Sequence, residues 1–453
     1  MSAATTAVST LLSNGGLGTG LNVAEIVSQT IEADSAPLTL LEDQQKTLTA
    51  ETAALNNISD DLISLQNAVD NLTYFTGDLS SQQATSSDIS ILSATAGPTA
   101  QQAVHSIVVN SLATTSTYYT NPATLPATGN TPLATGGTFK VTAGTNTASL
   151  TINSTNNTLN ELAAAIDNSS VGNAVTATVV QDSTGARLAV VSNTSGAPGD
   201  FTITDTGNST GLNFTKPVTG TNASLTVDGI PISSATNVVT GALQGVTLNL
   251  SGSNTNETVT LDVQPDDSQA VSAVNQFITA YNKVISDVNA QTAVNANTGS
   301  TGVLASDSTL SLVQDELFNA INYSENETIS SLAALGVNLQ NDGTLQLDTA
   351  TLSNALNTNF SSVQSFFQST TTGAGQALST ALNNLTDPTL SPVALDEQGI
   401  ANNQTDLANQ IATFNANLAQ EQIALTAKYS AVNVVLQQLP VLQQQISSQL
   451  QSL

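Results

Sequence analysis

The chain has 453 residues, of which 40% are hydrophobic and only 9% are charged, and its 34 acidic against six basic side chains give a formal net charge of −28. Six bases that lie far apart in sequence form no basic patch, which argues against nucleic acid or an anionic membrane as a partner. The absence of cysteine excludes disulfides and a thiol nucleophile, and no stretch approaches the ~18 apolar residues of a membrane span.

The first predicted helix follows the glycine-rich stretch GLGTGLNVAEIVSQ at residues 16–29. A dinucleotide-binding loop needs G-x-G-x-x-G after a hydrophobic strand, but here the third glycine comes one residue early and no such strand precedes it. Asn22 instead stands where an N-cap belongs, with Glu25 three residues on to close a capping box. The helix that follows carries an apolar stripe of Val23, Ile26, Val27 and Ile31.

The residues before this helix lack a basic n-region and a continuous apolar core, so no ordinary signal peptide is expected. A second, longer helix is predicted from Pro37, a residue suited to a first turn, to Phe75. Its apolar residues recur at spacings of three and four with one break near Ile58. This pattern describes one long amphipathic helix that needs a partner.

The period changes to two between about residue 100 and residue 263. Short β-branched runs such as HSIVVN, TFKVT, RLAVVS and VTLNL are bounded there by Gly, Asn, Asp and Pro. One helix interrupts them, with Thr158 as N-cap and Glu161 three residues on. The middle of the chain is therefore predicted to be an all-β or α+β insertion.

Helical periodicity returns after the β region. Apolar spacings of three and four predict one helix from Val271 to Val288 and a shorter one from Leu310 to Ile321. The segment GVNLQNDGTLQLD alternates on both sides of Asn-Asp-Gly at 341–343, which predicts a β-hairpin.

The C-terminal segment carries an apolar residue at every seventh position, which is the signature of a left-handed coiled coil. A second row is only partly apolar, because Glu421 and Lys428 occupy two of its places. Pro440 would cost about 3 kcal/mol inside a helix and predicts a kink or break just before it. An ordinary globular core helix remains the alternative interpretation. The sevenfold row is Ile411, Leu418, Leu425, Val432, Leu439, Ile446 and Leu453.

Candidate catalytic groups are few. His105 is the only histidine, and it shares strand parity with Ile107 and Val109, so it is predicted to be a packing residue. Asp266 and Asp267 are neighbours at a helix entry, where capping is a better interpretation than paired acid–base chemistry. The sequence offers no set of nucleophile, base and acid, so no enzyme and no cofactor are predicted.

A metal site is not predicted either. Residues 338–349 resemble a calcium loop only faintly, because Gln340 stands at a ligand position and Thr349 where the bidentate Glu belongs. The stretch is therefore predicted to be a turn.

Long amphipathic helices at the two ends each need a partner, and the simplest partner is the other end. The predicted fold class is therefore α+β multidomain, with terminal coiled-coil helices and a helical bundle into which antiparallel β domains are inserted. Such a chain is expected to be an elongated rod rather than a globule.

Nine short motifs, in one order over almost the full chain, resemble the flagellar hook-associated protein 2 family, the flagellar filament cap proteins. Residues 137–192 resemble the repeat shared by flagellin and hook-associated proteins. The motifs are GLGTGLNVAEIVSQ, SIVVNSLA, the span from GTFKV through TLNELAAAIDNS to ATVVQDSTGARLAVVS, LTVDGIPI, LQGVTLNL, FITAYNKVI, GVLASDSTL, LGVNLQNDGTLQLD and VQSFF.

The resemblance implies a homo-oligomeric ring at the extracellular tip of a bacterial flagellum that chaperones the folding and insertion of flagellin. It implies export by the flagellar type III apparatus and, as partners, flagellin, hook–filament junction proteins and an export chaperone. The apolar residues of the first helix and of the sevenfold row are expected to form its coiled-coil assembly interface. Two alternatives stay open: another axial protein, either flagellin or a hook–filament junction protein, and a surface adhesin with glycan-binding β domains.

Five domains are expected on this model. They are a disordered start and leg helix at 1–42, a helical domain with the hairpin at 43–78 and 265–395, an inner β domain at 79–130 and 221–264, an outer β domain with the flagellin/hook-type repeat at 131–220, and a C-terminal coiled-coil leg at 396–453.

Overall fold

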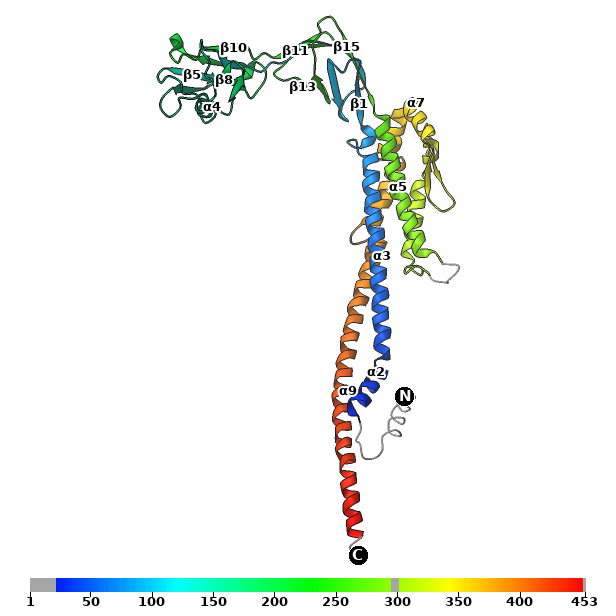
Figure 1. Cartoon of the computed structure of the whole chain (residues 1–453). Coiled ribbons are helices and arrows are strands. Elements are labelled where there is room, and N and C mark those ends of the chain that lie inside the picture. The colour runs from blue at the N-terminus through cyan, green and yellow to red at the C-terminus, as the bar shows by residue number, and fades with distance from the viewer. Residues whose placement is uncertain (1–21, 295–300, 451–453) are drawn as a thin grey trace. The chain divides into compact units, whose positions relative to one another are not determined.

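The computed structural model describes residues 22–294 and 301–450, and the chain divides into two compact units (Figure 1). Of the described residues, 22–73, 273–294 and 301–450 form a helical unit, and Tyr74–Ser272 form a β-rich unit. The fold class is α+β and multidomain, as the sequence predicted.

Seven α-helices, together with a short 3-10 helix and one hairpin, are the regular elements of the described part of the helical unit; the first six residues of α5 belong to the β-rich unit. They are α2 (Val23–Asp34), α3 (Ala36–Thr73), α5 (Asp267–Thr292), α6 (Thr309–Ile321), α7 (Thr349–Gln368), α8 (Ala374–Thr386), α9 (Pro392–Leu450) and η4 (Leu332–Leu335), with strands β16 (Val337–Leu339) and β17 (Leu345–Leu347).

Helix α3 is the centre of this unit, because α9, α8 and α7 all pack against it. Its inward face follows the predicted spacing, and Leu55, Leu62 and Leu65 are fully buried. The long helix predicted from Pro37 to Phe75 is thereby confirmed to within two residues at its C-terminal end. At the hairpin, Gly343 has a φ of +84°, a conformation that favours glycine, and the predicted turn is confirmed.

Helix α2 begins at Val23, directly after the predicted N-cap residue Asn22. The Asn22 Oδ1 atom accepts a hydrogen bond from the Glu25 backbone N–H at 3.3 Å, and the Asn22 side-chain amide donates to Glu25 Oε2 at 2.9 Å. A second predicted cap is confirmed at α4 (Leu159–Asp167), where Thr158 and Glu161 form a capping box.

The β-rich unit contains four antiparallel sheets. Their strands are β1 (Gln82–Ser86), β2 (Leu92–Ala96), β3 (Ala103–Ser111), β4 (Thr117–Thr120), β5 (Thr138–Ala143), β6 (Asn146–Thr151), β7 (Val175–Asp182), β8 (Gly185–Ser192), β9 (Phe201–Thr204), β10 (Phe214–Val218), β11 (Ala223–Val227), β12 (Ile230–Ser234), β13 (Val238–Leu243), β14 (Val246–Leu250) and β15 (Val259–Pro265), with 3-10 turns η1 (Asp78–Ser80), η2 (Ala197–Gly199) and η3 (Thr206–Asn208).

Two separate hydrophobic cores hold these sheets together. One core lies between the five-stranded sheet β1-β15-β3-β11-β12 and the three-stranded sheet β13-β14-β2. The other is built from the four-stranded sheet β10-β4-β8-β7, the three-stranded sheet β6-β5-β9 and helix α4. In both, alternate side chains point inward, for example Phe139 and Val141 of β5, which are fully buried.

Strand structure starts earlier than the period-two pattern predicted, and this boundary was wrong. Strands β1 and β2 precede residue 100, with the sequences QQATS and LSATA. Their side chains are small or polar, so they show little alternation of hydrophobicity, and their pairing with β15 and β14 determines their conformation.

Helix α9 continues through Pro440 to Leu450, so the break predicted before this proline is wrong. Proline removes one N–H donor and therefore one hydrogen bond, to the carbonyl of Leu436. Residues 437–450 are exposed, and water can hydrogen-bond the carbonyl that the proline leaves free.

Candidate assembly interface

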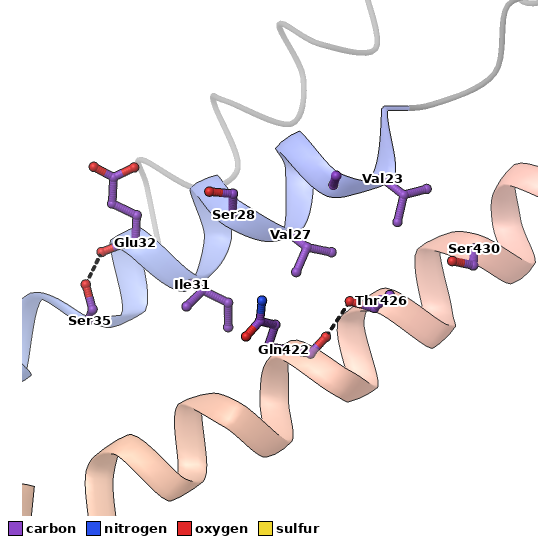
Figure 2. Close-up of a pocket in the computed structure, with 10 residues that line it drawn as sticks. Val23, Val27, Ser28, Ile31, Glu32, Ser35, Gln422, Thr426 and Ser430 are labelled. Atoms are coloured by element: carbon purple, nitrogen blue, oxygen red, sulfur yellow. Dashed lines mark hydrogen bonds between the residues drawn. The ribbon is translucent and has the colours of Figure 1, made fainter.

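Helix α2, which carries the first apolar stripe predicted from the sequence, packs against α9, which carries the sevenfold row. Ile26 and Val27 of α2 are each only 3% exposed, while Val23 and Ile31 are half-buried. Figure 2 shows the side chains of Val23, Val27 and Ile31 pointing from α2 toward α9.

The wall opposite this stripe is polar. Gln422, Thr426 and Ser430 of α9 are spaced by four residues and line a groove of about 770 Å³ together with Val23, Val27 and Ile31 of α2 (Figure 2). The Thr426 hydroxyl donates to the Gln422 backbone carbonyl at 2.7 Å, which holds this side chain against its own helix. This polar row was not predicted, although its spacing of four residues can be read from the sequence.

The sevenfold row of α9 is covered in its first half and open in its second. Leu418 is 9% exposed, and Ile411 and Leu425 are half-buried. Farther along, Val432, Leu439 and Ile446 are 42%, 44% and 54% exposed. The last member, Leu453, lies outside the described residues.

The second, partly apolar row of α9 continues toward the start of this helix, and there its side chains are buried. Val393, Ile400 and Leu407 are buried, and they extend that row toward the N-terminus at the same spacing of seven, in the part of α9 that packs with α3. The Gln404 side-chain amide donates to the Thr52 hydroxyl of α3 at 3.0 Å. These three positions were missed because the heptad count started only at residue 411.

His105, predicted to be a packing residue, is partly buried in the inward row of β3 and also pairs with a carboxylate, which the sequence did not indicate. Its Nδ1 atom lies 2.8 Å from Asp228 Oδ2, and its side chain is 16% exposed. The turn between β11 and β12 carries Asp228 to the end of the inward row of β3, where Asp228 also accepts a hydrogen bond from the Ser106 N–H. Hydrogen bonds from His105 and from the Ser106 N–H lower the pKa of Asp228. This pair joins two strands.

The other candidate residues have structural roles. The Asp266 carboxylate accepts from the backbone N–H groups of Ser268 and Gln269, so the predicted cap is confirmed. Asp342 accepts from the Thr344 N–H within the hairpin turn. Within residues 22–294 and 301–450, no group of three acidic or histidine side chains is placed to hold a metal ion. None of the described helices is long and apolar enough to cross a membrane.

Comparison with known proteins gives the family. Residues 19–116 match the model of the flagellar hook-associated protein 2 N-terminus, and residues 220–440 match that of its C-terminus. The B-type flagellar hook-associated protein 2 of Pseudomonas aeruginosa is 27% identical over 95% of both chains, and the flagellar hook-associated protein 2 of Escherichia coli K12 is 28% identical over 78% of this chain and 79% of its own.

A solved structure agrees with these matches. The crystal structure of three domains of the flagellar cap protein FliD from Escherichia coli aligns with 77% of this chain and 99% of its own, with a TM-score of 0.59 at 24% identity, and so has the same fold. The chain belongs to the flagellar hook-associated protein 2 family, the caps of flagellar filaments.

The function predicted from the motifs, a filament cap that assists the assembly of flagellin, is confirmed by this membership. Proteins of the family form oligomers at the filament tip, reach it through the flagellar export system and contact flagellin there. The family is structural and is not known for enzymatic activity.

Proposed function

We propose that the stripe of α2 and the sevenfold row of α9 form the assembly interface of the cap. Its first half is closed within one chain, and its second half is closed by the corresponding helix of a second copy in a ring. The interface residues proposed are Val23, Ile26, Val27, Ile31, Ile411, Leu418, Leu425, Val432, Leu439, Ile446 and Leu453.

One observation supports this proposal. Apolar residues continue at every seventh position of α9 beyond Leu425, although the side chains there are no longer buried. Val432, Leu439 and Ile446 repeat the pattern of Ile411, Leu418 and Leu425, but more than two-fifths of each is exposed. Burying a leucine or isoleucine stabilises by about 1.5–3 kcal/mol, so an uncovered row favours association with a similar helix.

The exposed residues of the sevenfold row also suggest further binding partners. An apolar stripe of this kind promotes non-specific association until it is covered, which supports a role for an export chaperone before assembly. Flagellin and the hook–filament junction proteins are proposed as the partners at the tip. The two separate hydrophobic cores of the β-rich unit support its division into an inner and an outer β domain.

Charging the open half of the row is expected to abolish oligomers without unfolding the chain. In the double variant Val432→Asp with Leu439→Asp, both new carboxylates stay in water in the monomer but would be buried, unpaired, in an oligomer. Sedimentation velocity is expected to show a monomer at concentrations where the unchanged protein is oligomeric, with an unchanged circular dichroism spectrum.

The matched control is Gln437→Asp with Gln444→Asp, two exposed positions on the same helix with the same spacing of seven. This control adds the same charge on a different face and is expected to assemble normally. Normal assembly of the Val432/Leu439 variant, or equal loss in both variants, contradicts the proposed interface.

Added salt is expected to strengthen the oligomers. Like subunits with a formal charge of −28 repel one another, and salt screens this repulsion while leaving apolar contacts in place. Sedimentation between about 20 mM and about 0.5 M sodium chloride is expected to show a falling dissociation constant. Oligomers that dissociate as salt rises would instead indicate that ion pairs hold the ring.

A further inference from the structure

The groove between α2 and α9 has two unlike walls, one apolar and one polar. Each wall is a row of side chains with a spacing of four residues, and such a row stands as a ridge on its helix. The space between two ridges can accept the side chains of a third helix. The apolar ridge of α2 therefore faces hydroxyl and amide groups across the groove instead of an apolar partner. The two ridges are Val23, Val27 and Ile31 of α2, and Gln422, Thr426 and Ser430 of α9.

The open half of the sevenfold row belongs to a wider apolar face of α9. Val435 and Leu442 lie between Val432, Leu439 and Ile446 at spacings of three and four residues. These two side chains are 61% and 51% exposed, and the three members of the row are 42–54% exposed. The five side chains together form the kind of knobs that one helix inserts into a groove of another.

A chain cannot fill its own groove with its own open row. Where α2 begins, at Val23, α9 has reached Ser430, and the open row starts two residues farther on (Figure 2). Helix α9 is a single helix from Pro392 to Leu450, so its residues 426 and 446 lie about 30 Å apart along the axis. Another copy of the chain is therefore needed to bring an open row to this groove.

The distribution of charge favours a second copy as the occupant. Copies with a formal charge of −28 repel one another wherever their acidic side chains meet. Residues 429–453 contain no charged side chain, and Glu32 is the only charged residue among the described residues that line the groove. Contact between these two surfaces therefore brings few like charges together.

We propose that the open half of the sevenfold row of one copy docks into the α2–α9 groove of the next copy, with its apolar side chains against the α2 ridge. This inference rests on the proposed assembly interface and names the surface that receives the open row. Because the two surfaces differ, each copy inserts its row into one neighbour and receives the row of another. Such a head-to-tail contact generates a ring when the rotation between copies closes.

Sedimentation velocity of the full chain tests this contact with two complementary variants. The row variant, Val432→Asp with Leu439→Asp, keeps the groove, and the groove variant, Thr426→Asp with Ser430→Asp, keeps the row. All four positions are exposed in the single chain, but the new carboxylates would be buried without partners in the contact, so each variant alone is expected to be monomeric. An equimolar mixture is expected to form a one-to-one dimer, because the intact row of the groove variant can enter the intact groove of the row variant.

The control is Ala416→Asp with Gln420→Asp, two exposed positions of α9 with the same spacing of four that are not among the lining residues. This control is expected to assemble like the unchanged protein. Normal assembly of the groove variant overturns the docking and leaves the proposed interface standing, whereas normal assembly of the row variant contradicts the interface itself. A mixture of the two variants that stays monomeric overturns the head-to-tail contact.

Hydrogen–deuterium exchange gives a second measurement that does not need the groove variant. Amides of residues 23–34 are expected to exchange at least about tenfold more slowly in the assembled unchanged protein than in the monomeric row variant, because the docked row restrains the opening of α2. Residues 309–321 of α6 serve as the reference and are expected to exchange equally in both. Equal exchange of residues 23–34 in the two samples overturns the proposal.

Discussion

Replacing Leu418 and Leu425 together by aspartate is expected to abolish capping while the chain stays soluble and is still exported. Leu418 is 9% exposed and Leu425 is half-buried in the covered half of the sevenfold row. Each substitution removes the transfer energy of a leucine and places an unpaired charge in the contact, a loss of several kcal/mol. The first half of the assembly interface should therefore open.

The β-rich unit is expected to be unaffected by this change. Its two cores contain only residues between Ile91 and Val263, and this unit is compact by itself. The signature is therefore specific: flagellin accumulates as monomer in the culture medium, motility is lost, and the purified variant keeps a normal β signal in circular dichroism.

A matched control adds the same two charges to α9 at neighbouring positions outside the sevenfold row. Asn417 and Ala424 are exposed, lie next to the two leucines and have the same spacing of seven, so the variant with aspartate at both is expected to cap normally. Filaments of normal length with the Leu418/Leu425 variant would show that this seam is not needed at the tip. Loss of the β signal would show that the two units do not fold independently.

The helices of this chain could be predicted because their signals are local. Residues 36–73 and 267–292 bury apolar side chains at spacings of three and four, and Asn22 and Thr158 cap helices within three residues of themselves. Such patterns depend on a single element, so one sequence is sufficient to recognise them.

Features that depend on a partner element were missed. Strands β1 and β2 lack hydrophobic alternation. They form because their backbones pair with those of β15 and β14. The hydrogen bond between Gln404 of α9 and Thr52 of α3 joins two helices that are far apart in sequence. Nothing in the local composition around either residue predicts that contact, because the path of the chain through α7 and α8 decides it.

The second prediction with a large effect concerns the core built around α4. Phe139 of β5 is fully buried, lies opposite Leu150 of β6, and its ring centroid is 4.9 Å from that of Phe214 with an interplanar angle of 44°. Phe139→Ala removes the ring and leaves a cavity, which is expected to lower the free energy of unfolding by about 3–5 kcal/mol.

This loss is expected to be confined to one of the two β cores, since Phe139 contributes to the α4 core and not to the one formed around β3 and β14. Hydrogen–deuterium exchange in increasing urea is expected to show residues 138–151 opening at lower urea in the variant, with residues 103–111 unchanged. Phe318→Ala provides the control, because that phenylalanine is 51% exposed on α6 and its removal should change neither segment. If residues 103–111 open at the same lower urea concentration as residues 138–151, the two cores unfold as one cooperative unit, and the β-rich unit is a single domain with two hydrophobic clusters.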